Sequence, residues 1–296
     1  MAISLGINPI TWSNDDLQHV GADISLDTCL SEAATAGFTG IELGHKFPRD
    51  AKLLQPILDK HGLSLVSGWY SGHLLERDAK KEAAAMKSHA SLLADMGCNV
   101  LIFAEVTGCI HSDIDARLSR RPRMAAADWK QFGQRLSEIA RVTADLGLKL
   151  CYHHHMGTVV QSDADIDALM QATSDDVHLL LDTGHALFAG ADPVQLAGQY
   201  TERIGHLHCK DIREKPMRRC MNRDGSFLDA VLDGAFTVPG DGCVNYEGVF
   251  SSLGSDYSGW AIVEAEQDPS VAPPMTFAKL GYDNLRKLVG PEHDVA

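Results

Sequence analysis

The feature that most constrains this chain is a regular alternation of short apolar segments with longer amphipathic ones along its whole length. The short segments hold four or five residues each and are largely apolar, which is typical of strands buried on both faces of a parallel sheet. The sequence predicts eight such strands, at Ile3–Ile7, Gly40–Leu43, Leu63–Ser67, Val100–Ala104, Leu148–Tyr152, Val177–Leu181, Ile204–Leu207 and Trp260–Val263.

The amphipathic segments between these strands have the periodicity of helices. Two of them begin at residues suited to cap a helix, Asp78 and Ser162, whose side chains can accept hydrogen bonds from the first turn. Four end at a glycine, which can adopt the left-handed conformation that terminates a helix. The expected helices are Leu26–Ala36, Ala51–His61, Asp78–Met96, Ala126–Leu146, Asp163–Ala172, Pro193–Glu202, Tyr246–Leu253 and Pro274–Val289, and the glycines are Gly37, Gly62, Gly97 and Gly147.

Eight strand–helix units in succession leave few topologies, because crossovers between parallel strands are right-handed and do not thread through one another. A doubly wound sheet is the main alternative, but no GxGxxG motif follows the first strand. We therefore expect an α/β protein with one domain over residues 1–296, folded as a (β/α)₈ TIM barrel.

Two connections, 105–125 and 211–245, are too long for plain loops. Both follow strands, so both belong to the end of the barrel where such enzymes place their active sites. The second connection is too apolar for a disordered insertion, since it contains Phe227, Leu228 and Phe236. We expect this long loop after strand seven to pack as a lid.

Charge and cysteine content exclude several classes of partner. The net charge of −14 argues against nucleic acid and against an anionic membrane, because both require a basic surface. No segment approaches the ~20 apolar residues of a membrane span, and the first residues lack the features of a signal peptide. The seven cysteines include no CxxC pair, which predicts free thiols in the reducing cytoplasm.

Side chains that can bind metal follow the last four expected strands. Alternation along a strand places one inward residue on each, giving His153, Asp182, His208 and Glu264. This mixed nitrogen and oxygen set suits Mn²⁺, Co²⁺, Fe²⁺ or Zn²⁺. A lone buried histidine is more often structural, but four successive strand ends of this type favour a metal site. Alternation does not decide between His153 and His155, which lie on the same face.

These segments also resemble a known superfamily. The motifs Asp182–His185, His206–Asp211 and Val263–Glu264 are similar to the xylose-isomerase-like sugar isomerase and epimerase barrels, whose metal ligands end strands five to eight. Within that superfamily the chain resembles the myo-inosose dehydratases of bacterial inositol breakdown. The matching segments are Gly6–Trp12, Asn14–Asp16, Ala36–Glu42, Tyr152–Thr158, Asp182–His185, Phe236–Gly242 and Val263–Pro269.

The resemblance implies a carbon–oxygen lyase that removes water from scyllo-inosose (2-keto-myo-inositol) and forms a trihydroxycyclohexane-1,2-dione during inositol catabolism. It also implies Mn²⁺ or Co²⁺ as the metal and glutathione as a further cofactor. One departure concerns the first metal ligand, which is usually Glu in the superfamily and aligns with His153 here. Loss of one carboxylate suits an elimination, and it leaves open whether His153 is a ligand or a general acid.

Other polar residues near the strand ends are candidates for proton transfer and substrate binding. We expect His155 and His185 to donate a proton to the leaving hydroxyl, and Glu105 or Lys210 to act as the base. The substrate is expected to be a small cyclic polyol ketone, whose C–H faces suit aromatic rings. Its expected contacts are Trp12, Trp69, His73 and Glu266.

Three other functions are open to a chain of this kind. A ketose or hydroxypyruvate-type isomerase or epimerase would exchange solvent deuterium into its substrate without loss of water. A metal-dependent polyol-binding regulator would bind without turnover. An abasic-site endonuclease needs a basic groove, which the net charge of −14 opposes. The oligomeric state is open as well, with a homo-oligomer as one alternative.

Overall fold

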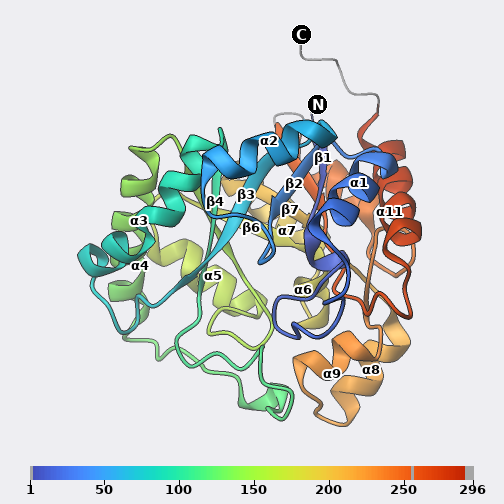
Figure 1. Cartoon of the computed structure of the whole chain (residues 1–296). Coiled ribbons are helices and arrows are strands. Elements are labelled where there is room, and N and C mark those ends of the chain that lie inside the picture. The colour runs from blue at the N-terminus through green and yellow to red at the C-terminus, as the bar shows by residue number, and fades with distance from the viewer. Residues whose placement is uncertain (1–2, 255–256, 291–296) are drawn as a thin grey trace.

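The computed structural model describes residues 3–254 and 257–290. Parallel strands form a closed barrel in which neighbours along the chain are also neighbours in space. Figure 1 shows helices packed around these strands. The expected eight-stranded TIM barrel is therefore confirmed. Its strands are β1 (Ile3–Ile7), β2 (Gly40–Leu43), β3 (Ser64–Gly72), β4 (Val100–Glu105), β5 (Lys149–His153), β6 (Val177–Asp182), β7 (Ile204–Cys209) and β10 (Gly259–Val263).

The helices form where the sequence predicts them, with small shifts at their ends. Ser162 and Asp165 make a reciprocal capping box at the start of α5, and Asp78 caps α3. Gly37 and Gly62 end α1 and α2 with φ of 113° and 67°, conformations that favour glycine. The helices that cover the barrel are α1 (Leu26–Ala36), α2 (Ala51–His61), α3 (Ala79–Asp95), α4 (Trp129–Ala144), α5 (Asp163–Ala172), α7 (Pro193–Gln199), α10 (Tyr246–Ser252) and α11 (Pro274–Val289).

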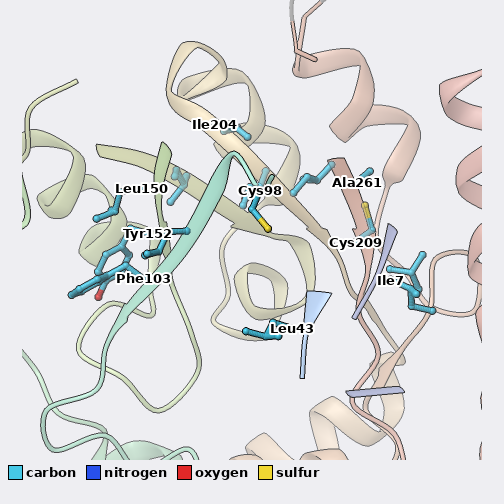
Figure 2. Packing of buried hydrophobic residues seen from close by; sticks show 14 of the residues in the cluster. Ile7, Leu43, Cys98, Phe103, Leu150, Tyr152, Ile204, Cys209 and Ala261 are labelled. Carbon is cyan, nitrogen blue, oxygen red and sulfur yellow. The ribbon is translucent and has the colours of Figure 1, made fainter. Parts of the chain in front are cut away.

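Strand alternation separates two layers of buried side chains. On β5, Leu150 and Tyr152 point outward into the main core beneath the helices, where Figure 2 shows Tyr152 beside Phe103 of β4. Cys151 belongs to a separate cluster inside the barrel, with Leu180 of β6. Residues two positions further along each strand continue the inward face toward the strand ends.

Three helices were not predicted. The segment α6 (Thr183–Phe188) starts directly after β6, while α8 (Glu214–Asn222) and α9 (Phe227–Leu232) lie in the long connection after β7. That connection also contains a small antiparallel pair, β8 (Asp211–Ile212) with β9 (Phe236–Thr237). Short 3₁₀ turns are η1 (Pro9–Thr11), η2 (Leu118–Arg120) and η3 (Thr201–Arg203), and η3 shortens the helix expected over Pro193–Glu202.

The long connection packs as a lid, as expected. Figure 1 shows α8 and α9 together at one end of the barrel. Phe227, Leu228, Val231 and Phe236 are buried in a core of their own with Phe188 of α6. This apolar core fixes the lid against the ends of β5 and β6. Among residues 3–254 and 257–290, no helix has the length and apolar character that crossing a bilayer requires.

Candidate metal centre

Four potential ligands meet at the end of the barrel that the lid covers. His153 ends β5, Asp182 ends β6, His208 lies near the end of β7 and Glu264 follows β10. All four side chains are buried. Each offers one ligand atom, and these atoms all lie within 4.8 Å of one another. Residues far apart in the sequence therefore converge on one point because they end neighbouring strands.

The ligand atoms of these four residues lie close enough together to face one common ion position. His153 Nε2 lies 3.2 Å from His208 Nδ1 and 3.5 Å from Asp182 Oδ2. His208 Nδ1 lies 3.6 Å from Asp182 Oδ2 and also contacts Glu264 Oε2. Asp182 Oδ1 accepts a hydrogen bond of 2.7 Å from the backbone N–H of His185 and so caps α6.

The second carboxylate oxygen of Asp182, Oδ2, indicates that this group of residues can hold a cation. Asp182 Oδ2 is buried and has no hydrogen-bond partner in the part of the chain that the structure describes. A buried carboxylate oxygen without a partner is costly unless a cation neutralises it. Two imidazoles and two carboxylates form a donor set that suits a divalent transition metal. The residues present therefore fit one such ion, and His153 rather than His155 joins this group.

A second cluster adjoins the first and contains His155, His185 and Glu266, whose ligand atoms also lie within 4.8 Å of one another. The fully buried ammonium of Lys210 lies between them, 2.5 Å from Glu266 Oε1 and 3.0 Å from His185 Nε2. It also lies 2.9 Å from Glu264 Oε1. This cluster therefore already contains a cation.

Lys210 keeps its charge in this environment. Burial disfavours the ammonium, but the carboxylates of Glu264, Glu266 and Asp182 outweigh burial and raise the pKa of Lys210. In the ammonium form Lys210 has no lone pair that could take a proton, which favours a role as a buried cation. Its role as a base stays a prediction.

The orientation of His155 defines which of its nitrogens is free. Its Nδ1 lies 2.7 Å from the carbonyl oxygen of Met156 and donates to it. Burial lowers the pKa of His155 well below its usual value, so the ring is neutral and Nε2 carries a lone pair. His185 lies behind it, with ring centroids 3.8 Å apart, and Phe227 of the lid packs on both rings.

A cavity of about 240 Å³ opens beside the first group and reaches the second. Trp69 lies on its wall, with its ring centroid 5.2 Å from that of His153 and 5.7 Å from that of His155. Glu266 also lines it. The expected placement of Trp69 and Glu266 beside the strand ends thus agrees with the structure. The other lining residues are Asn8, Ile10, Asp15, Asp16, Glu42, Leu43, Ser71, Ile102, His111, His153, His155, His208 and Glu264.

Three predicted site residues lie elsewhere. The carboxylate of Glu105 accepts hydrogen bonds from the backbone N–H groups of Leu74 and Thr107, at 2.6 and 3.1 Å, and so fixes two loops. Trp12 is buried in the core, where its indole donates to Glu32. The carbonyl of His73 accepts from the backbone N–H of Arg77 in the turn that leads into α3. Local contacts thus occupy the side chains of Glu105 and Trp12, and none of the three residues is among those that line the cavity.

Sequence reasoning missed Asp16 and His111 on the cavity wall. Asn14 Oδ1 accepts from the backbone N–H groups of Asp16 and Leu17, and this tight turn holds Asp16 in place. His111 Nε2 lies 3.8 Å from Asp16 Oδ1. The segment Asn14–Asp16 carried part of the resemblance without a stated role. His111 lies in the long connection 105–125, where no periodicity marks a single residue.

Comparison with known proteins places the chain in a family. The model of the xylose isomerase-like TIM barrel matches residues 30–288. The chain belongs to this family. Members similar to it over 97% of its length include the rhizopine catabolism protein MocC of Rhizobium meliloti, at 45% identity over 89% of that protein. Inosose dehydratase 2 of Bacillus cereus and the inosose dehydratase of Geobacillus thermodenitrificans are 41% and 38% identical, each over 98% of its length.

Solved structures share the fold of this chain at lower identity. The IOLI protein with a binding zinc atom has a TM-score of 0.69 at 17% identity, covering 97% of this chain and 99% of that one. The probable 3-DHS dehydratase AsbF of Bacillus anthracis has a TM-score of 0.68 at 17% identity, covering 96% and 98%. These structures support the closed barrel as the fold.

Proposed function

We propose that this protein is a metal-dependent inosose dehydratase, a hydro-lyase that removes water from scyllo-inosose to form a trihydroxycyclohexane-1,2-dione. The observation that carries the proposal is the convergence of His153, Asp182, His208 and Glu264 within 4.8 Å, beside a cavity lined by His155 and Glu266. Full-length relatives named inosose dehydratase, at 37–41% identity, support the choice of reaction.

The four-residue group would hold one divalent cation, with Mn²⁺ or Co²⁺ favoured by the family resemblance and Fe²⁺ or Zn²⁺ also suited to the donor set. Such an ion would act as a Lewis acid toward the substrate carbonyl and its neighbouring hydroxyl. Asp182 and Glu264 would supply the negative charge, while His153 and His208 would bind the ion through a ring nitrogen. His153 is therefore assigned to the metal and not to proton transfer.

His155 is the base of the proposed reaction. His155 lines the cavity, and because its Nδ1–H is held by the carbonyl of Met156, its lone pair is on Nε2. The C–H bond next to the ketone breaks, Nε2 takes the proton, and the bonding electrons form the carbon–carbon double bond of the enolate. This assignment replaces the expectation that His155 donates a proton, since a neutral Nε2 without hydrogen can only accept.

Glu266 is the acid that assists the leaving group. Burial raises the pKa of Glu266 to about 7, although the neighbouring Lys210 opposes this effect, so part of the population carries a proton near neutrality. Glu266 gives this proton to the departing hydroxyl, which leaves with its electron pair as water. The Glu266 carboxylate then regains a proton from solvent, while the ammonium of Lys210 keeps its charge and holds this carboxylate in place through a 2.5 Å hydrogen bond, with His185 on its other side.

The experiment that tests the proposal is a turnover assay with purified protein, scyllo-inosose and each of Mn²⁺, Co²⁺, Fe²⁺ and Zn²⁺. Appearance of the ultraviolet absorbance of the dione supports dehydration. Deuterium exchange from D₂O without that absorbance would instead indicate an isomerase or epimerase. Binding of the polyol without either signal would indicate a regulator. Rhizopine belongs in the substrate panel because of the relative named for its catabolism.

The proposal also includes the cellular compartment, a further cofactor and the oligomeric state of the enzyme. Residues 1–296 act as one domain on a small cyclic polyol ketone in the cytoplasm, where the seven cysteines, all free thiols, would stay reduced. Glutathione enters by family resemblance, and running the assay with and without it measures its contribution. Size-exclusion chromatography with light scattering distinguishes a monomer from a homo-oligomer.

A further inference from the structure

A buried carboxylate that has no role so far lies directly behind the metal centre. Glu42 is on β2, and its side chain is almost inaccessible to solvent. Its Oε1 accepts a 2.6 Å hydrogen bond from Ser67 Oγ, and its Oε2 accepts a 2.8 Å hydrogen bond from Asn8 Nδ2. These two donors lie on either side of β2 in the barrel, at the end of β1 and on β3. The orientation of the Glu42 carboxylate is thus fixed without help from the metal ligands.

The same carboxylate contacts two histidines of β7. Oε1 of Glu42 lies 2.9 Å from His206 Nε2 and 3.2 Å from His208 Nε2. Ser67 and Asn8 donate to its two oxygens, and an ionised carboxylate offers acceptors only, so a histidine nitrogen that faces it acts as a donor. The N–H of each histidine therefore lies on its Nε2 atom.

His208 has two different environments for its two ring nitrogens. Nε2 faces Glu42, whereas Nδ1 faces His153, Asp182 and Glu264. A neutral imidazole has one N–H and one lone pair. Because Glu42 takes the N–H at Nε2, Nδ1 is the nitrogen through which His208 would bind a metal, together with the other three ligands. Carboxylate–histidine–metal arrangements of this kind set the tautomer and the basicity of a ligand in many metalloproteins.

We infer that Glu42 is a positioning residue for the metal centre, which holds His208 in the tautomer and orientation that bind a divalent cation through Nδ1. The inference rests on the metal centre of the proposed function and adds to it a residue outside the four ligands. It makes metal affinity depend on β2, a strand that contributes no ligand to the four-residue group.

A different use of the same residues must be distinguished. Ligand atoms of Glu42, His206 and His208 also lie within 4.8 Å of one another, so they could form a separate ion site. The inference opposes this, because each Nε2 already lies at hydrogen-bond distance from Oε1. The stoichiometry of binding separates the two arrangements, since a second site would take up a second ion.

The test is a Co²⁺ titration of the metal-free protein, followed by calorimetry and by the visible absorption of the bound ion. The variant is Glu42→Gln, which keeps the shape of the side chain and removes its charge. The matched control is Glu82→Gln, another fully buried carboxylate, which lies on α3 and accepts from Tyr70. Melting curves of the metal-free proteins establish that each variant is folded.

We expect wild type to bind one ion per chain. Glu42→Gln should also bind one, with Kd raised about 10- to 100-fold and an altered Co²⁺ spectrum, because loss of a partner behind a ligand has effects of this size. Glu82→Gln should keep the wild-type Kd and spectrum. Should Glu42→Gln not fold, Glu42→Asp tests the same claim, since it keeps the charge but withdraws it from His208.

Three results would overturn the inference in distinguishable ways. If the Kd of folded Glu42→Gln, or of Glu42→Asp in its place, is within about twofold of wild type, Glu42 has no positioning role. The metal centre itself would then remain intact. Two ions in wild type and one in Glu42→Gln would make Glu42 a ligand of a second site. A folded wild type that binds no ion removes the metal centre itself.

Discussion

Two clusters of histidines and carboxylates lie side by side at the end of this barrel, and they differ in how their charge is balanced. In the first, Asp182 Oδ2 is buried without a hydrogen-bond partner among the residues described. In the second, the ammonium of Lys210 lies within 3.0 Å of both Glu266 and His185. Both satisfy the distance criterion for a metal site. The two clusters share this ammonium, which also lies 2.9 Å from Glu264 Oε1 and 3.7 Å from Asp182 Oδ2 of the first. Its contact with Glu266 in the second cluster is the shortest, so the first cluster is the one left more open to a metal.

The largest effect is expected from removing the charge of the first cluster with Asp182→Asn. This change keeps an oxygen that can cap α6 but replaces one ligand oxygen with an amide. We expect loss of bound metal, and a fall in kcat/KM of about 10³-fold or more, because a Lewis acid contributes several kcal/mol. Elemental analysis and the dione assay measure the two effects. Full metal content together with wild-type turnover would exclude the first cluster as the metal site.

The next effect separates proton transfer from metal binding. His155→Asn removes the proposed base, which lies in the second cluster, and should lower kcat by about 10²–10⁴-fold. The number of ions bound per chain should stay at the wild-type value, because His155 is not one of the four proposed ligands. A variant that loses its metal instead would move His155 into the first cluster and contradict the division between the two.

Lys210→Met tests the difference between the two clusters by removing the ammonium group from the second one. The carboxylates of Glu264 and Glu266 then lose a buried partner, and the free energy of unfolding of the metal-free protein should fall by about 3–5 kcal/mol. Zn²⁺ should restore part of this loss, with the number of ions bound per chain rising above that of wild type. Chemical denaturation with and without Zn²⁺ provides the measurement. Equal stability of variant and wild type in the metal-free state would show that Lys210 does not balance this cluster.

The smallest effect concerns Trp69, which contacts one histidine ring from each cluster. Trp69→Phe should raise KM by about 2- to 12-fold, which corresponds to the 0.5–1.5 kcal/mol of an aromatic contact. Trp12→Phe is the matched control, because it removes an indole that is hydrogen-bonded to Glu32 in the core. That control should lower stability by about 1 kcal/mol and leave KM unchanged. Equal KM changes in the two variants would contradict the placement of Trp69 in the substrate cavity.

The fold could be predicted because strand burial and helix periodicity repeat eight times along the chain. The short helices α6, α8 and α9 were missed for a physical reason. They have six to nine residues and lie within connections where no strand–helix alternation marks them, and tertiary packing of Phe227 and Phe236 stabilises the lid. A short helix of this kind depends on its surroundings more than on its own sequence.

The sequence predicted which strand ends carry the candidate ligands, but it did not always predict which residue at that end is the ligand. His153 and His155 share a face by alternation, and only the path of the chain after β5 separates them into two clusters. The charge of Lys210 depends on carboxylates from two other strand ends, which no local pattern reveals. Glu105 follows its strand as an active-site residue would, but two backbone N–H groups hold its carboxylate elsewhere.

The most direct test of this account is a crystal structure of the protein soaked with Mn²⁺, with the ion located by its anomalous scattering. The account predicts one strong peak per chain, shared by His153, Asp182, His208 and Glu264, and no peak between Glu266 and His185 where Lys210 lies. A peak in the second cluster with the first one empty, or no ordered ion at this end of the barrel, would contradict it.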